Sequence, residues 1–267
     1  MERDRADDRR GPAHSIVISI VENLVCGMQF YGCARPTAEI CDLSDQCLMY
    51  CGLNYAAFNA AVLRAPVVAH TRELMRLIEE AREFYEPRGV RWTYWLCEDS
   101  LEPAVAREAA AIFRRYGLRV LTEAPGMYAD SLAPGAPLVD LRPVVDSAAR
   151  AAFARIISAT FDIPQAVCTA VYESERGWNG GLDGYVGYVD GKPVTTAAVA
   201  EGGGVSGFYS VATLPAYRRK GYAEATMRQA LQERGGTKTV LQSTQAGLKL
   251  YEKMGYRKVA GFRVFIA

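Results

Sequence analysis

The spacing of apolar residues predicts alternating strands and helices in the first half of the chain. Between residues 74 and 85 apolar side chains recur every three or four positions, as on a helix with one buried face, and Pro87 and Gly89 end that pattern. Short apolar runs predict strands. The elements expected here are strands at 47–52 and 60–63, a helix over 74–85, a strand at 90–97, a helix over 105–116 and a strand at 118–122.

The second half also alternates, and it contains a hairpin signal. Asp190-Gly191 lies between two apolar runs and suits a tight turn between antiparallel strands. Hairpins together with one strand–helix–strand unit predict an α+β (mixed α/β) fold rather than a Rossmann fold or a TIM barrel. The expected elements are strands at 138–143, 185–189, 194–200, 205–213, 238–242 and 257–265, and helices over 149–160, 164–173, 223–231 and 247–254.

A Pro/Gly-rich stretch, Ala133 to Pro137, is the best candidate for a linker between two domains. We therefore expect a disordered tail at 1–14, a first domain at 15–132 and a second domain at 138–267. The tail is expected to be disordered because Met1 to Arg10 is almost entirely charged or small.

The overall charge and hydropathy point to no nucleic-acid or membrane partner. The formal net charge is +1, so no whole-protein field favours nucleic acid. The charged start does not resemble a secretory signal, and we find no apolar run that approaches the roughly 20 residues of a membrane span. These observations predict a cytoplasmic protein.

The chain contains seven cysteines, five of them between residues 26 and 51. They show no paired Cys-x-x-Cys spacing, and His14 and His70 do not complete a metal-ligand set. We interpret the cysteines as reduced, mostly buried small hydrophobes and predict no metal site.

The most informative segment is a basic, glycine-containing loop, Arg218-Arg219-Lys220-Gly221-Tyr222-Ala223. It follows an apolar strand pattern and opens a helical one. A helix N-terminus carries partial positive charge and free N–H groups, and Gly221 would let the backbone approach a ligand closely. The arrangement is typical of a phosphate-binding loop. Read by itself, it could also be a solvated basic turn before a surface helix.

A second informative segment runs from Leu241 to Tyr256. Together with the basic loop, it makes the sequence from about Leu138 onward resemble the GNAT superfamily of N-acetyltransferases. Arg218, Gly221 and Ala223 match the family's Arg/Gln-x-x-Gly-x-Gly/Ala loop, and Leu250-Tyr251 with Gly255-Tyr256 is similar to its Leu-Tyr-x-x-x-Gly-Phe signature. The resemblance implies a mostly antiparallel mixed sheet flanked by helices. The element order of the first half resembles the degenerate GNAT-like domain that precedes the active one in some two-domain members.

The resemblance also implies which residues bind acetyl-CoA, the acyl-donor substrate. The loop would hold the pyrophosphate through backbone N–H groups and the side chains of Arg218, Arg219 and Lys220. The strand before it would pair with the pantetheine arm, and an N–H near Val211 would polarise the thioester carbonyl. The predicted cofactor-binding residues are Ser210, Val211, Ala212, Thr213, Arg218, Arg219, Lys220, Gly221, Tyr222, Ala223 and Ser243.

Two residues are predicted to act in catalysis. Tyr251 matches the family position that protonates the departing thiolate, although it shares a helical face with Leu250 and Met254 and could simply pack. The general base is harder to place, because the strand before the loop carries no acid. Glu201 is our choice, with Glu173, Glu175 and Asp183 as alternatives. An amine that arrives deprotonated, or a water wire, would need no carboxylate.

These inferences predict an acyltransferase that moves acetyl from acetyl-CoA to a primary amine, small-molecule or peptide, by direct attack in a ternary complex. Trp178, Tyr185 and Tyr209 could line the acceptor site or the core, and the first domain would close one side of the cleft. A non-catalytic acyl-CoA-binding sensor or scaffold is the main alternative. An aminoacyl-tRNA-dependent transferase would require a basic surface. The protein is expected to be a monomer or homodimer.

Overall fold

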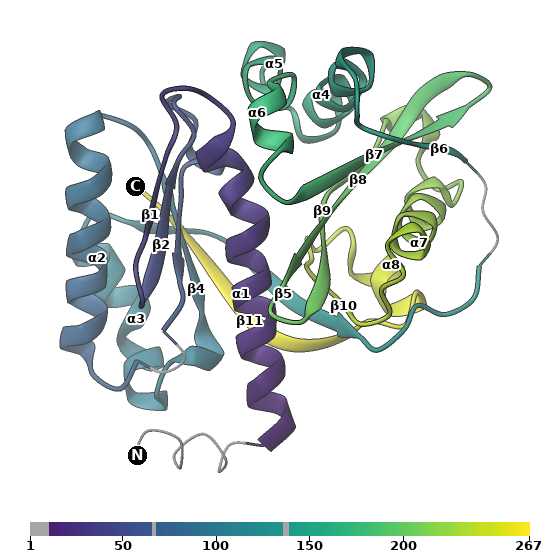
Figure 1. Ribbon diagram of the computed structural model, residues 1–267. Coiled ribbons are helices and arrows are strands. Elements are labelled where there is room, and N and C mark those ends of the chain that lie inside the picture. The colour runs from purple at the N-terminus through teal and green to yellow at the C-terminus, as the bar shows by residue number, and fades with distance from the viewer. Residues whose placement is uncertain (1–10, 66–67, 136–138) are drawn as a thin grey trace.

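The computed structural model describes residues 11–65, 68–135 and 139–267, and within them one continuous sheet of 11 strands (Figure 1). The order across the sheet is β1-β2-β3-β4-β11-β5-β10-β9-β8-β7-β6. Most neighbouring strands are antiparallel, as the sequence predicted, and the pairs β3–β4 and β9–β10 are parallel. The strands are β1 Glu39–Asp42, β2 Gln46–Tyr50, β3 Ala60–Leu63, β4 Thr93–Cys97, β5 Arg119–Ala129, β6 Asp140–Pro143, β7 Leu182–Val189, β8 Lys192–Gly202, β9 Val205–Thr213, β10 Thr239–Gln242 and β11 Arg257–Ile266.

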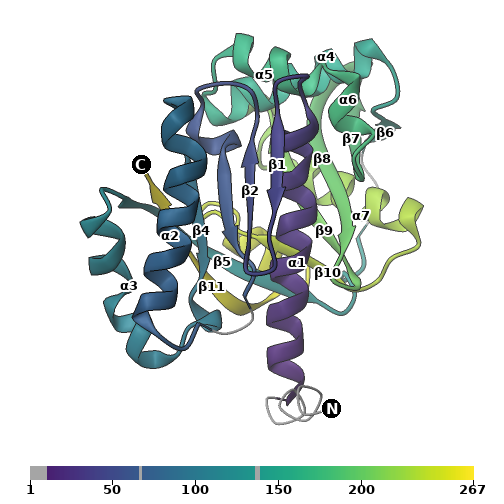
Figure 2. The same ribbon diagram turned by 60° about the vertical axis from the view of Figure 1, so that its left-hand side comes forward.

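Helices cover both faces of this sheet (Figures 1 and 2). In chain order they are α1 Gly11–Cys33, α2 Thr71–Tyr85, α3 Pro103–Arg115, α4 Ser147–Phe161, α5 Gln165–Tyr172, α6 Glu175–Trp178, α7 Tyr222–Arg234 and α8 Leu248–Lys253. Asp146 caps α4, because its carboxylate accepts a hydrogen bond of 2.7 Å from the Ala149 N–H. Gly177 and Trp178 belong to the short helix α6, for which the sequence predicted no element.

The two halves of the sequence interlock through their last strands. Strand β11 leaves the second half and lies between β4 and β5, with Phe262 opposite Cys97 on one side and Ala124 on the other. Strand β5, from the first half, lies between β11 and β10. The segments 15–132 and 138–267 therefore follow each other in sequence, but in the sheet each one places a strand between two strands of the other. The predicted linker joins them, and residues 136–138 of this region lie outside the described residues.

Helix α1 packs against strands of both halves (Figure 2), and the sequence interpretation missed it. The segment His14–Cys33, with a mean hydropathy of 1.5, is by length and composition apolar enough to cross a membrane, so the expectation that no apolar run approaches that length was wrong. In the structure 56% of its most apolar window is buried inside the protein. Ile20 and Leu24 share a core with Met49 of β2 and Val205 of β9. A helix that packs on several sides has no single apolar stripe, and so gives no amphipathic signal.

The helix α1 begins at Gly11, so the predicted disordered tail at 1–14 is too long by several residues, while residues 1–10 lie outside the described part. The seven cysteines are free thiols, of which Cys47, Cys51, Cys97 and Cys168 are buried. Their burial agrees with the interpretation as small hydrophobes.

Strands β9 and β10 diverge after a short parallel contact, and this divergence positions the site described below. They pair only at Ser206 with Thr239 and at Gly207 with Val240. On the other edge of β9 the register with β8 skips Ser210 and Val211, because Ser210 adopts φ +50°. Because of this bulge, neither Ser210 nor Val211 has a register partner on β8 or β10.

Candidate active site

A cavity of about 710 Å³ lies where β9 and β10 diverge, beside the N-terminus of α7 and the helix α8. Segments far apart in the sequence meet there, because the parallel strands β9 and β10 end at the same edge of the sheet and are followed by α7 and α8. The cavity is lined by Thr160, Phe161, Val211, Ala212, Thr213, Arg218, Arg219, Gly221, Ala223, Glu224, Thr244, Ala246, Gly247, Leu250 and Tyr251. It thus joins most of the predicted phosphate loop, the predicted pantetheine strand and the predicted catalytic tyrosine.

The loop before α7 presents a series of free backbone N–H groups. Arg219 and Gly221 adopt left-handed backbone conformations, with φ +61° and +83°, and Gly221 is the N-cap of α7. Within the part of the chain that the structure describes, no N–H from Arg219 to Glu224 donates to a protein acceptor. Consecutive free N–H groups at a helix N-terminus form a concave site for an anion. A left-handed arginine is an uncommon conformation that such a loop requires.

The charged side chains of the loop support this geometry. Arg218 donates from Nε to the carbonyl of Thr213 at 3.2 Å and from Nη2 to that of Thr160 at 3.3 Å, tying the loop to β9 and α4. Glu224 is the acid nearest the loop along α7. Its hydrogen bond to Arg228 lowers the pKa of its carboxyl, and Lys253 adds a second cation at 3.2 Å. The carboxylate is therefore neutralised locally and does not oppose an anion in the cavity.

Tyr251 lines the same cavity. Gly247 allows this packing, because a Cβ there would approach the tyrosine ring to 2.6 Å. Burial raises the pKa of Tyr251 to about 12. Its hydroxyl makes no hydrogen bond to any residue that the structure describes. The phenol is thus protonated, and its hydroxyl is free to donate a hydrogen bond to a ligand. The ring also packs against Tyr256, with ring centres 5.8 Å apart.

Four predicted binding residues lie next to the cavity without lining it. The Ser243 side chain is buried and donates to the carbonyl of Thr244 at 2.7 Å. Lys220 lies over the ring of Tyr217, with Nζ 5.4 Å from the ring centre, and the ring of Tyr222 lies 6.4 Å from the same ring at an interplanar angle of 48°. Ser210 directly precedes the cavity-lining Val211. Its hydroxyl is on the face of the sheet that α5 covers, 3.4 Å from that of Tyr172.

Glu201 is not near this cavity, which corrects the prediction that it supplies the general base. The register places Glu201 opposite Ser206, whose hydroxyl donates to it at 2.8 Å, and Arg234 lies 3.7 Å away. Val211 is five residues further along β9, about 16 Å at the usual rise of a strand. Of the alternatives, Glu175 and Asp183 line a separate cavity of about 280 Å³, and Glu173 accepts from Thr169 at 2.9 Å.

The aromatic residues suggested for an acceptor wall do not line the 710 Å³ cavity. Trp178 and Tyr185 both line the separate cavity of about 280 Å³. Trp178 also packs 4.9 Å from the ring of Phe30 and donates from Nε1 to the carbonyl of Tyr172, and Tyr185 packs in the core with residues of α7. Tyr209 lies on the side of β9 that faces α1, where its hydroxyl donates to Asn23 at 2.7 Å. Two further phenols, Tyr31 and Tyr172, come close to Ser210, and sequence reasoning missed both because nothing in the local pattern places α1 there.

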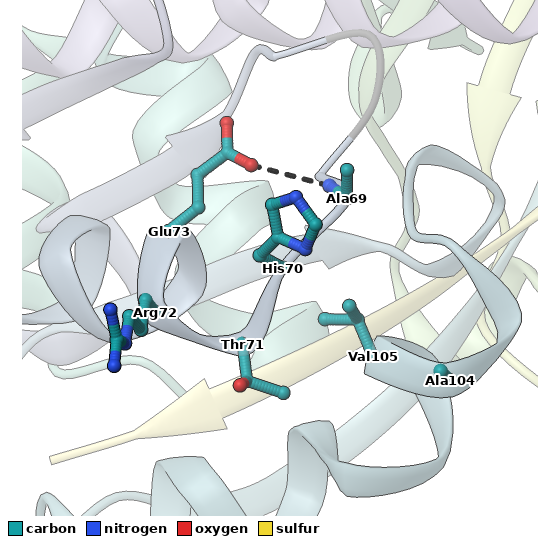
Figure 3. Close-up of a pocket in the computed structure, with 7 residues that line it drawn as sticks. All are labelled: Ala69, His70, Thr71, Arg72, Glu73, Ala104 and Val105. Carbon is teal, nitrogen blue, oxygen red and sulfur yellow. Dashed lines mark hydrogen bonds between the residues drawn. The ribbon is translucent and has the colours of Figure 1, made fainter.

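A second cavity, of about 650 Å³, lies between the N-termini of α2 and α3 in the first half (Figure 3). Here the Glu73 carboxylate, in the first turn of α2, accepts a hydrogen bond of 3.2 Å from the N–H of Ala69, which lies two residues before the helix. An acid at this place repels an anionic ligand. The two halves therefore differ: Glu224 of α7 is paired with Arg228 and Lys253, whereas Glu73 of α2 forms no ion pair within the described residues.

Comparison with known proteins agrees with this architecture. Residues 180–258 match the family model described as the acetyltransferase (GNAT) domain. A GCN5-related N-acetyltransferase from Kribbella flavida is 19% identical, with 91% of this chain and 94% of that chain covered and a TM-score of 0.66. A tandem GNAT protein from the clavulanic acid biosynthesis pathway is 10% identical, with 92% and 94% covered and a TM-score of 0.57. A GCN5-related N-acetyltransferase from Sphaerobacter thermophilus is 16% identical, with 85% and 82% covered and a TM-score of 0.55.

The protein therefore has the fold of tandem GNAT proteins, and residues 180–258 of its second half match the GNAT domain model. This match supports acyl transfer in general. No curated protein matches the chain, so the comparisons do not identify a donor or an acceptor.

Proposed function

We propose that the protein transfers an acetyl group from acetyl-CoA to a primary amine, which attacks the thioester directly in a ternary complex. The observation that carries this proposal is that one cavity joins an open N–H cradle at α7 to the protonated phenol of Tyr251. The cradle fits a pyrophosphate, and the unpaired edge of β9 between them offers backbone groups to an extended pantetheine arm.

Each chemical step has a group to support it. The pyrophosphate binds at Arg219 to Glu224, and the arm follows β9 toward the bulge. There the N–H of Val211 is placed to stabilise the oxyanion that forms when the amine attacks the carbonyl carbon. As the C–N bond forms and the C–S bond breaks, Tyr251 donates a proton to the sulfur.

The raised pKa of Tyr251 affects this last step. Transfer from this buried phenol, of pKa about 12, to a thiolate whose thiol kept its ordinary pKa of about 8.5 would be unfavourable by about 5 kcal/mol. The same buried surroundings raise the pKa of the departing thiol as well, since burial disfavours any charged form. The mismatch between the two pKa values inside the cavity is therefore smaller than the ordinary pKa of the thiol suggests.

A covalent acyl-enzyme is disfavoured by the state of the cysteines. None of those in the described residues lines the cavity. Burial raises the pKa of Cys51 and of Cys168 to about 11, and at neutral pH such thiols are protonated and weakly nucleophilic. Direct transfer to the acceptor is the simpler chemistry for this site.

Release of CoA thiol from acetyl-CoA, measured with amines of several classes, tests the proposal. We expect release well above the rate of background hydrolysis with at least one class. Tight CoA binding without release for any amine would instead favour the non-catalytic sensor or scaffold. Absence of CoA binding would remove both functions.

A further inference from the structure

Three hydroxyl groups form a chain beside the bulge of β9. The Ser210 hydroxyl lies 3.4 Å from that of Tyr172 on α5, and this phenol lies 3.0 Å from the hydroxyl of Tyr31 on α1. The backbone of Ser210 is held in its left-handed conformation by Thr196, whose hydroxyl donates to the Ser210 carbonyl at 2.8 Å. The chain thus begins at the residue before Val211, which lines the cavity.

Aromatic rings from both halves of the sequence surround this hydroxyl chain. Tyr31 stacks on Phe58 with ring centres 4.6 Å apart, and Tyr172 stacks on Phe30 at 5.5 Å. Tyr172 is buried, whereas Tyr31, Tyr209 and Ser210 each keep some exposed surface. The first half therefore contributes a hydroxyl to the surroundings of the predicted reaction centre, on the face of the sheet opposite α7.

The groups that face these phenols are uncharged. Burial raises the pKa of Tyr31, Tyr172 and Tyr209, and the titratable neighbours that affect them are the thiols Cys26, Cys51 and Cys168 and the phenols themselves. Asp162, at the end of α4, raises the pKa of Tyr55 as the smallest contribution after burial and Cys168. Within the described residues no carboxylate is among the groups that shift the pKa of Tyr31, Tyr172 or Tyr209.

We infer that the hydroxyl chain Ser210–Tyr172–Tyr31 receives the acceptor, and that this acceptor is an uncharged amine on an aromatic or similarly flat apolar group rather than a polyammonium compound. The inference rests on the proposed acetyl transfer. An ammonium ion would enter an apolar site without an opposite charge, which costs several kcal/mol. A neutral aromatic amine instead places its ring among aromatic rings and its N–H groups on hydroxyl oxygens.

The proton balance is in accord with a neutral acceptor. When a neutral amine attacks, the C–N bond forms, the C–S bond breaks, one proton leaves nitrogen and one proton reaches sulfur from Tyr251. The phenolate of Tyr251 then recovers the proton that nitrogen released, so the enzyme needs no group that retains a proton. An ammonium acceptor would release one further proton, for which a base is required.

Thiol release with acetyl-CoA and three acceptors tests the inference: 4-methoxyaniline, 2-phenylethylamine and spermidine. At neutral pH we expect kcat/KM for 4-methoxyaniline to exceed that for spermidine at least about tenfold and to be almost independent of pH. For 2-phenylethylamine it should rise about tenfold per pH unit from about pH 6 to about pH 9, following the free base. A preference for spermidine overturns the inference alone, while no release with any amine, including the classes tested above, overturns the proposed function and the inference with it.

Variants locate the effect in the hydroxyl chain. Tyr172→Phe and Tyr31→Phe each remove one hydroxyl and keep the ring. We expect each to raise KM for 4-methoxyaniline or lower kcat by about tenfold, with KM for acetyl-CoA changed less than about twofold. Tyr188→Phe is the matched control, because this ring on β7 packs against the guanidinium of Arg142 on β6 and lines neither site. Acceptor constants within about twofold of wild type in both variants would overturn the assignment.

Discussion

The Tyr209 hydroxyl donates a hydrogen bond of 2.7 Å to Oδ1 of Asn23, and this contact joins α1 of the first half to β9 of the second. Nδ2 of Asn23 lies 3.0 Å from the carbonyl of Ala200 and 2.9 Å from that of Val205. The fit is tight, since a Cβ on Gly207 would approach Oδ1 to 1.6 Å. One buried amide therefore fixes α1 on the turn between β8 and β9.

Replacing this amide should destabilise the whole protein. Asn23→Ala leaves two buried carbonyls and the half-buried phenol of Tyr209 without this partner, and we expect a loss of about 3 kcal/mol in the free energy of unfolding. Urea unfolding measures it. Asn179→Ala, at an exposed position, is the control and should change stability by less than about 0.5 kcal/mol. Equal stability of the two variants would contradict the role assigned to Asn23.

Two glycines of helix α7 separate ligand binding from stability. Gly221 before the helix and Gly235 after it both have left-handed backbones, with φ +83° and +67°. Alanine at either position should cost about 1 kcal/mol of stability. Only Gly221→Ala should also weaken CoA binding, by at least about tenfold, because it disturbs the N–H cradle. Calorimetric titration of both variants with CoA tests this, and equal CoA affinities would remove the cradle assignment.

The sequence predicted best those features that depend on local pattern. The helix expected over 74–85 is α2, Thr71–Tyr85, and the helix after the basic loop is α7. The cavity joins Arg218, Gly221, Ala223 and Tyr251, which belong to two motifs about 30 residues apart. The chemistry of their roles stays a prediction, whereas their proximity follows from the parallel pairing of β9 and β10.

Features that depend on long-range contact could not be predicted. The strand expected at 118–122 extends through Pro125 and Gly126 to Ala129, although both residues usually interrupt strands. The partner strand β11 shifts register between Lys258 and Ala260, close to Pro125. The Pro125 carbonyl accepts instead from the N–H of Ser243. Tyr31 and Tyr172 likewise come together only through the packing of α1 on the second half.

The difference between the two helix N-termini predicts one bound acyl-CoA per chain. Calorimetric titration with CoA should give a stoichiometry close to one, because Glu73 in the first turn of α2 forms no ion pair within the described residues and would repel an anion. Glu73→Ala should cost about 1 kcal/mol of stability through the lost hydrogen bond to the Ala69 N–H and leave the CoA affinity of the second half unchanged. A second equivalent of CoA bound to the wild-type chain would contradict this account.

Tyr251→Phe removes the proposed proton donor and should lower kcat by about 10²- to 10³-fold, with little effect on CoA affinity. The wild-type pH profile gives a second test. The raised pKa, about 12, keeps the phenol protonated as pH rises, so its ionisation should cause no fall in kcat below about pH 11. Tyr256→Phe is the matched control, because its neighbouring hydroxyl bonds to Thr239 at 3.0 Å in the core. That variant should lose about 1 to 2 kcal/mol of stability and retain kcat. If Tyr251→Phe also retains kcat within about twofold, the sulfur receives its proton from another donor.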